Sequence, residues 1–478
     1  MNSNHTYLNT VKYLVENFEF TTIDTMYMVS TLPDAHVINR PCKYFNDLFN
    51  IHTYRIKNTN QYYHNKDVID YYLKENIHLP LLDLDSAIES PKKVILQLQF
   101  HPGNRDFNEI REKFFDEFFK EHPRVLSEMK SGNIFLFLYF GFEADSFYYN
   151  DYNTEEGNLK NYYEMFENVI IDYNLPHNSM IILSSNALGY DHEKLQYGEN
   201  SPIVKCIFDN VLEYDTFTKL KGSLDAIDYD FEEHIENIKN SKIYALRLSR
   251  TTNMYRDLML YYIFKSKNTD KCIIEHNDFS LTNETLSYNL NKCIDICEKY
   301  NYTDIIEFFK FDEDVYNEIV SNLPYSYDES DKNELTTGHY GIEPISHDVY
   351  KKSLFSWVST SLLDKENQVF INSSTINPML YYHPLIIHGN THHIEKIKES
   401  GFETFQFMGD ESHDNNNDVF FRFVNNVRVI NNLFSMNRND IIELLIENKH
   451  KLIKNKEMVF NCNSIENIIY NFSKILSL

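Results

Sequence analysis

Residues 370–414, FINSSTINPMLYYHPLIIHGNTHHIEKIKESGFETFQFMGDESHD, carry the pattern that decides the fold. HPLIIHG at 383–389 is a short apolar run ended by a glycine, which predicts a buried strand. The segment THHIEKIKESG follows with helical spacing and ends at Gly401, and TINPMLYYH before it is also helix-like. Helix, strand and helix in direct succession indicate an α/β unit built on a parallel sheet.

The same alternation extends toward the N-terminus. Apolar runs that predict strands are KKVILQLQF (92–100), NIFLFLYFGFEAD (133–145), NSMIILSSNA (178–187), KIYALRLS (242–249) and LFSWVST (354–360). Amphipathic stretches between several of them predict helices. We interpret the acidic segment near 215–240 as a link and 300–345 as irregular. The sequence therefore predicts an α/β protein with two Rossmann-like domains, 1–238 and 239–478, that face each other across a cleft.

Composition limits the partners and the compartment. The 478 residues carry a net charge of −26, from 45 basic and 71 acidic side chains, with no basic stripe. Nucleic acid is therefore an unlikely partner, and an anionic membrane surface is disfavoured. No run of 18 apolar residues predicts a membrane span. The six cysteines are sparse and lack CxxC spacing, which favours buried thiols over a metal site and fits a reducing, cytoplasmic location.

Four features occur in a fixed order in the second half: Pro378, HPLIIHG, GFETF at 401–405 and DESHD at 410–414. In this order and spacing the chain resembles glycosyltransferases of phages and bacteria that are distantly similar to fucosyltransferases and have the GT-B arrangement of two Rossmann-like domains. The resemblance spans roughly residues 90–435. It implies transfer of a sugar from a nucleotide-diphosphate donor to a glycan, protein or other hydroxyl acceptor, in the host cytoplasm if a phage encodes the chain.

The resemblance also implies which residues bind the donor. Negative charge grows on the leaving diphosphate, and basic side chains and helix N-termini stabilise it without a metal or other cofactor. Arg250 and Arg256 match two basic positions of the family, and Arg247 is a further candidate. The alternative interpretation makes these arginines ordinary ion-pair residues on the surface or between domains.

Other positions depart from the family pattern. Thr360 and Ser373 stand where the family has glutamate, and Ser374 and Asn377 stand where it has lysine. Neutral contacts to a ribose or phosphate are weaker than charge-assisted ones. Two hypotheses therefore remain: an active glycosyltransferase with an altered donor site, or a catalytically degenerate protein that binds a partner, such as a phage accessory or virion component.

Three further positions are candidates for roles in such an enzyme. Glu143 ends an apolar run and aligns with an acidic family position, which makes it the candidate general base; an ordinary strand-end carboxylate is the alternative. His101 follows a similar run. Gly389 begins a turn through Asn390 and Thr391 that could contact the nucleotide or be a plain connection.

Two clusters could suggest a metal, and we expect none in either. His392 and His393 are neighbours on a helix and should point in different directions, and His383 and His388 should face opposite sides of a strand. We expect His388 to line a pocket. The acidic residues of DESHD, Asp410, Glu411 and Asp414, lack the calcium-loop spacing and are interpreted as a solvated loop.

Overall fold

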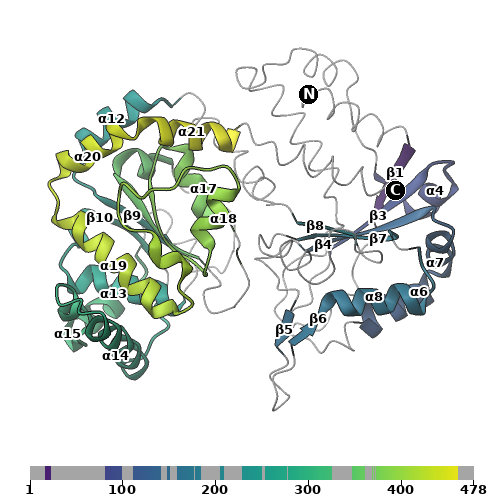
Figure 1. Ribbon diagram of the computed structural model, residues 1–478, viewed down its shortest axis with the longest axis horizontal. Coiled ribbons are helices and arrows are strands. Elements are labelled where there is room, and N and C mark those ends of the chain that lie inside the picture. Colours follow the sequence, from purple (N-terminus) through teal and green to yellow (C-terminus); the bar gives the residue numbers. More distant parts are fainter. Residues whose placement is uncertain are drawn as a thin grey trace. The chain divides into compact units, whose positions relative to one another are not determined.

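The computed structural model describes residues 17–22, 81–99, 111–140, 148–150, 159–176, 178–184, 205–208, 229–249, 253–276, 278–325, 347–360, 369, 371 and 373–460. The chain divides into two compact units (Figure 1): unit 1 comprises Met1–Tyr214 and Asn461–Leu478, and unit 2 comprises Asp215–Phe460. The described residues of unit 1 lie between Asn17 and Phe208, and those of unit 2 between Tyr229 and Phe460.

Unit 1 contains a six-stranded sheet in the order β2-β1-β3-β4-β7-β8. Every pairing in it is parallel. The strands are β1 (Phe18–Thr22), β2 (Leu81–Leu82), β3 (Lys93–Gln99), β4 (Ile134–Phe140), β7 (Met180–Ser184) and β8 (Lys205–Phe208). A short antiparallel pair, β5 (Tyr148–Asn150) and β6 (Leu159–Asn161), lies outside this sheet. The parallel strands confirm the prediction made from the uninterrupted apolar runs.

The helices in the described part of unit 1 pack on one face of that sheet. They are α4 (Leu84–Glu89), the π-helix η2 (Glu112–Asp116), α6 (Glu117–Glu121), α7 (Pro123–Lys130) and α8 (Tyr162–Asp172). Leu96 and Leu136 point into this layer, whereas their neighbours Ile95 and Phe135 are buried on the opposite face. Gly132, with φ of 75°, follows the end of α7 and lets the chain turn back into β4.

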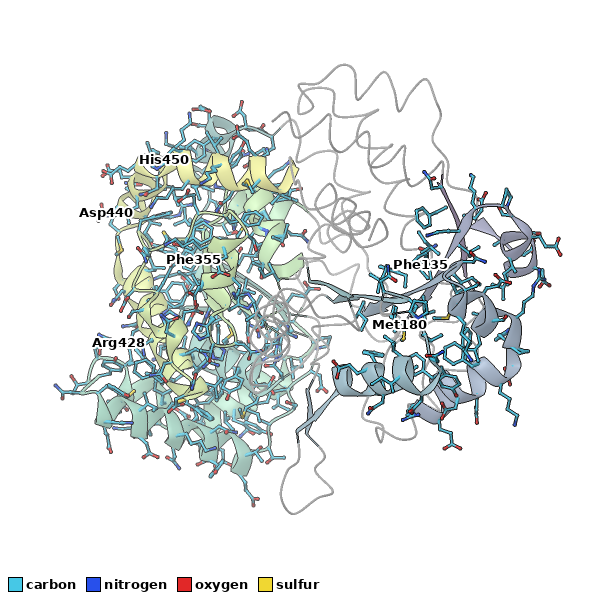
Figure 2. The ribbon with its side chains drawn as sticks, turned by 45° about the vertical axis from the view of Figure 1, so that its right-hand side comes forward. Phe135, Met180, Phe355, Arg428, Asp440 and His450 are labelled. Atoms are coloured by element: carbon cyan, nitrogen blue, oxygen red, sulfur yellow. The ribbon has the colours of Figure 1, made fainter. Side chains whose placement is uncertain are left out.

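Unit 2 contains a four-stranded parallel sheet in the order β10-β9-β11-β12. Its strands are β9 (Ala245–Ser249), β10 (Cys272–His276), β11 (Phe355–Ser359) and β12 (Leu385–His388). All residues of β11 and β12 are buried, because helices cover both faces of the sheet. Phe355 accordingly lies in the interior of the unit, while Asp440 and His450 lie on its outer helices (Figure 2).

The helices of unit 2 form two layers, one on each side of the sheet (Figure 1). One layer holds α12 (Phe231–Lys239), the 3-10 helix η5 (His347–Lys352), α17 (Ser373–Leu380), α20 (Arg438–Glu447) and α21 (Lys449–Phe460). The other holds α13 (Met254–Lys265), α14 (Asn283–Lys299), η4 (Ile306–Phe309), α15 (Glu313–Ser321) and α19 (Val419–Ser435). Three short helices also lie in the described part of the unit: η3 (Thr269–Lys271), α18 (His393–Glu399) and η6 (Ser412–Asn415).

Two sequence interpretations are wrong in part. The segment interpreted as a link contains α12, whose Phe231, Ile235 and Ile238 are buried in unit 2. Because α12 belongs to unit 2, the expected domain boundary at 238/239 falls inside a packed helix. The stretch interpreted as irregular includes η4 and α15. As expected, the thiols of Cys272, Cys293 and Cys297 are free and buried.

Candidate functional site

The strand order of unit 2 creates a topological switch point between β9 and β11. From β9 the chain passes through α13 to β10 on one side, whereas β11 lies on the other side of β9. In open parallel α/β sheets, ligands bind outside the carboxyl ends of the strands at such a point. The candidate functional site is therefore the carboxyl edge of this sheet together with the first turn of α13.

Asn253 fixes the start of α13 at this edge. Its backbone is extended, with φ of −151°, and its side-chain oxygen accepts a hydrogen bond from Arg256 N at 2.9 Å. The side-chain Nδ2 donates to Thr360 O at 3.4 Å, directly after β11. One asparagine thus caps the helix and connects it to the neighbouring strand.

The last residues of the four strands form a transverse row. Ser249 pairs with His276, and Ser359 pairs with His388. The register of β9 with β11, continued by three residues, places Ser249 opposite Ser359. His276 contacts Asp257 of α13, and His388 contacts Tyr255 of the same helix, so this face of the row lies under the first turn of α13.

Three buried arginines bind backbone carbonyls at the strand ends. Arg256 donates to Ser359 O through Nη2 at 3.0 Å and through Nε at 3.3 Å. Arg247 donates to Glu275 O at 3.2 Å and to Arg256 O at 2.8 Å. Arg422 of α19 donates to Gly389 O at 3.0 Å. These guanidinium groups thus donate to main-chain carbonyl oxygens within unit 2.

A buried polar network connects β9, β10 and α13. Arg247 Nη1 lies 3.1 Å from His276 Nδ1; a guanidinium only donates, so this nitrogen accepts and the proton sits on Nε2. That Nε2 donates to Asp257 Oδ1 at 2.9 Å. Ser280 donates to Asp257 Oδ2 from both N, at 2.8 Å, and Oγ, at 2.6 Å. Burial lowers the pKa of His276 more than the bond with Asp257 raises it, so the ring is neutral.

The close approach of the His393 side chain explains why residue 389 is a glycine. A Cβ atom at this position would lie 2.6 Å from His393 Cγ, closer than packed carbon atoms can be. His388, directly before it, is fully buried, and its Nε2 lies 3.3 Å from Val419 O. The other ring nitrogen of His388 and the hydroxyl oxygen of Ser359 are buried without a hydrogen-bond partner in the described structure.

The structure brings three of the predicted donor residues to this one edge. Arg256, Thr360 and Gly389 all lie there: Thr360 N donates to His388 O at 3.0 Å, and Arg256 is engaged as described above. Ser373 and Ser374 are the first residues of α17, and Asn377 lies one turn later with a buried, unpartnered Oδ1. Glu143, Arg250 and His101 lie outside the described residues.

The acidic loop is solvated only in part: Asp410 is exposed, as predicted, whereas Glu411 is half-buried and Asp414 is buried. Asp414 is 7% exposed, and its Oδ2 accepts a hydrogen bond from Glu395 N at 3.0 Å, which anchors the start of α18. Glu411 Oε1 accepts from Phe405 N at 2.7 Å. Burial raises the pKa of both carboxyl groups. Both side chains thus hold the connection between α18 and α19 together.

The histidines point in the directions expected from the sequence. His392 is exposed and pairs with Glu395 at 2.7 Å, whereas its neighbour His393 is buried, so the two point in different directions. His383 is also buried and hydrogen-bonds Ser356 Oγ through Nδ1 at 3.0 Å. Within the described ranges, no group of three or more His, Cys, Asp or Glu side chains could hold a metal ion.

No protein-family model, curated protein or solved structure matches this chain. None of the helices in the described part combines the length and the apolar character that crossing a bilayer requires. The description of the two units as Rossmann-like therefore rests on their parallel sheets alone.

Sequence reasoning missed the Asp257–His276–Ser280 network and the role of Arg422. One signal could have pointed to the network: Asp257 lies in the first turn of the helix MYRDLMLYYIFK, where apart from Arg256 and the last residue Lys265 no other charged side chain occurs. An acidic residue in a helix with no polar face needs a buried partner. The partner of Arg422, the carbonyl of Gly389, is 33 residues away and has no sequence signal.

Proposed function

We propose that the protein is a nucleotide-sugar-dependent glycosyltransferase whose donor site lies at the carboxyl edge of the unit 2 sheet. The observation that carries the proposal is the strand order β10-β9-β11-β12, which puts a switch point beside the N-terminus of α13. This is the arrangement in which α/β proteins hold nucleotides. The sugar-transfer step rests on the resemblance of residues 370–414 to glycosyltransferases.

The proposal gives each element a role. The N-terminus of α13, a helix of 12 residues, faces the diphosphate, because the first turn of a helix favours negative charge. Arg250, three residues before the cap Asn253, supplies the basic side chain that meets the leaving group. Arg256 supports this edge by binding Ser359 O. Glu143 takes the proton of the acceptor hydroxyl, which comes from a glycan or a protein.

A second candidate function is favoured by one observation. The described arginines of the edge, Arg247, Arg256 and Arg422, all donate to backbone carbonyls inside the unit. Together with the neutral residues Ser373, Ser374 and Asn377, this leaves less positive charge for a diphosphate than an active donor site requires. A degenerate protein of the same fold, which binds a glycan or a protein partner without catalysis, accounts for this pattern.

A thermal-unfolding screen against UDP, GDP and related nucleoside diphosphates, with and without Mg²⁺, separates the two functions. A nucleotide at 100 times its dissociation constant adds about 2.7 kcal/mol to the free energy of unfolding. Stabilisation by one nucleotide supports the transferase and names its base. No stabilisation by any of them at millimolar concentration rejects it in favour of the binding protein.

Arg250→Ala tests the proposed diphosphate contact. We expect it to abolish most of the nucleotide-induced stabilisation while it leaves the melting temperature of the ligand-free protein unchanged. Arg124→Ala is the matched control, because Arg124 lies in unit 1 with half of its side chain exposed. Equal nucleotide binding by both variants would remove Arg250 from the site.

A further inference from the structure

Two buried polar atoms at the carboxyl edge of unit 2 have no hydrogen-bond partner among the residues that the structure describes. They are Oγ of Ser359 and Nδ1 of His388. The side chains are 7% and 0% exposed, respectively. A buried polar atom without a hydrogen bond costs about 1–3 kcal/mol, so native proteins rarely leave two of them together.

The sheet register puts these two side chains next to each other. Ser359 of β11 and His388 of β12 are paired residues on adjacent parallel strands, so their side chains leave the same face of the sheet. His388 packs against the ring of Tyr255, with 4.8 Å between ring centroids. Trp357, two residues before Ser359, packs against Tyr262 of α13. Both unpartnered atoms therefore lie on the α13 face of the row at the proposed donor site.

Hydrogen-bond geometry fixes what His388 can offer. Its Nε2 lies 3.3 Å from Val419 O, and a carbonyl oxygen only accepts, so Nε2 carries the proton. Burial lowers the pKa of His388 well below its usual value, and the charge of Arg422 lowers it further, so the ring is neutral. The lone pair of Nδ1 can then only accept a hydrogen bond.

Ser359 supplies the complementary group. Its hydroxyl can donate or accept, and its position is fixed because its own carbonyl binds the Arg256 guanidinium. A single ligand hydroxyl satisfies both atoms: it donates to His388 Nδ1 and accepts from Ser359 Oγ. A phosphate oxygen only accepts and would meet the Nδ1 lone pair, and an ammonium group only donates.

We propose that Ser359 and His388 form a hydroxyl-binding subsite that holds a hydroxyl group of the ligand, either on the ribose of a nucleotide or on a sugar. The subsite rests on the proposed function, because it assigns part of the donor to the edge at which the nucleotide is expected. It predicts discrimination against ligands that lack one hydroxyl. A site that loses such a partner leaves both protein atoms unpaired again.

Isothermal titration calorimetry of the full chain tests the subsite. The probes are UDP and GDP, their 2′-deoxy and 3′-deoxy counterparts, and the free monosaccharides glucose, galactose and fucose. If the ribose fills the subsite, one deoxy nucleotide binds about tenfold or more weakly than its parent. If a sugar fills it, the deoxy nucleotides bind like their parents and a monosaccharide binds on its own.

Substitutions of Ser359 and His388 test whether their side chains cause the preference for the ligand hydroxyl. Ser359→Ala should weaken the hydroxyl-bearing ligand about tenfold and remove the preference for it, while the ligand-free protein keeps or gains stability, because an unpaired buried hydroxyl is removed. His388→Asn should retain part of the affinity, because its amide oxygen can replace Nδ1 as acceptor, whereas His388→Leu should lose it. A purely structural role would lower stability and leave the ligand preference intact.

The outcomes separate the subsite from the proposed function. Nucleotide binding with no preference for any hydroxyl, unchanged in Ser359→Ala, overturns the subsite alone and leaves a buried water as the partner of the two atoms. Monosaccharide binding that depends on Ser359, without nucleotide binding, upholds the subsite and overturns the nucleotide donor. Binding of neither class overturns both.

Discussion

The sheet faces that lie under helices differ between the described parts of the two units. In unit 1 the described side chains between the sheet and its helix layer are apolar, from Val94 and Leu96 to Leu136 and Ile182. In unit 2 the corresponding face under α13 carries Arg247, His276, Ser359 and His388 near the strand ends. Burying polar groups costs free energy that an apolar core avoids. The comparison thus contrasts an apolar face in unit 1 with a polar one in unit 2, at the end of the sheet where we propose that a ligand binds.

Asp257→Ala should produce the largest effect on stability. It removes the acceptor for His276 Nε2 and for two donors of Ser280, and it removes one of the two carboxylates, with Glu275, that favour the charged form of the buried Arg247. We expect a loss of about 3–5 kcal/mol in the free energy of unfolding, measured by urea denaturation. Asp278→Ala, on the exposed neighbouring turn, is the control. A loss under 1 kcal/mol would mean that the polar face of unit 2 is not an integrated network.

Leu136→Ala tests the apolar face of unit 1. Leu136 is fully buried between β4 and the helix layer, and its truncation should cost about 2–5 kcal/mol through lost transfer energy and the remaining cavity. Ile171→Ala, at a position 62% exposed on α8, should change stability little. Hydrogen exchange should locate the loss in unit 1, and ligand binding should stay unchanged. Altered ligand affinity in Leu136→Ala would contradict the placement of the proposed ligand site in unit 2.

Acid should destabilise unit 2 more than unit 1. Burial lowers the pKa of His383 to about 4, whereas an unfolded histidine titrates near 6.5. Between these values the unfolded chain binds more protons, so the stability contributed by neutral His383 is complete above pH 6.5 and falls as the pH falls. The loss from pH 7 to pH 5 is about 2 kcal/mol.

The measurement is urea denaturation at both pH values, with His383→Gln and the exposed His392→Gln as variants. Only the first should reduce the pH dependence of the free energy of unfolding. Equal pH dependence in the wild type and His383→Gln would exclude His383 as the titrating group. Within the described part of unit 1 no histidine is buried, so hydrogen exchange should report the acid effect in unit 2.

Substitution of one glycine in each unit should have the smallest effects on the free energy of unfolding. Gly389→Ala places a Cβ atom 2.6 Å from His393 Cγ and should cost about 1–3 kcal/mol by overpacking. Gly132→Ala meets no atom within 4 Å but must adopt φ of 75°, which costs about 1–2 kcal/mol. Only Gly389→Ala should also alter ligand binding, as measured by calorimetry. Weakened binding in Gly132→Ala would show that the units are coupled.

The sequence predicted the strands well where local pattern alone determines them. The runs around Ile95, Leu136, Ile181 and Ile386 are apolar enough to be buried on both faces of a parallel sheet. The sequence predicted the strands less well where contacts between residues far apart in the chain determine them. No strand was predicted at CIIEH of β10, because its last two residues are polar and their partners, Arg247 and Asp257, lie far along the chain.

The candidate site was predicted in place but not in its contacts. Gly389, Thr360 and Arg256 do meet at one edge, as their positions after strands and at a helix start suggested. Their partners could not be predicted: Arg256 binds a carbonyl 103 residues away, and charge alone does not distinguish a ligand-binding arginine from one that binds backbone. Ser359 and His388 became candidates only when the register placed them side by side.

The arginine bound to the end of β11 has a consequence for how ligand preference can change. Ser359 O accepts two hydrogen bonds from Arg256, so both of its lone pairs are occupied. At Gly389 the carbonyl is likewise held, by Arg422. Main-chain oxygens, which no substitution removes, are thus withdrawn from recognition at these two strand ends. If the proposed ligand binds at this edge, side chains rather than these two carbonyl oxygens must distinguish it from other ligands.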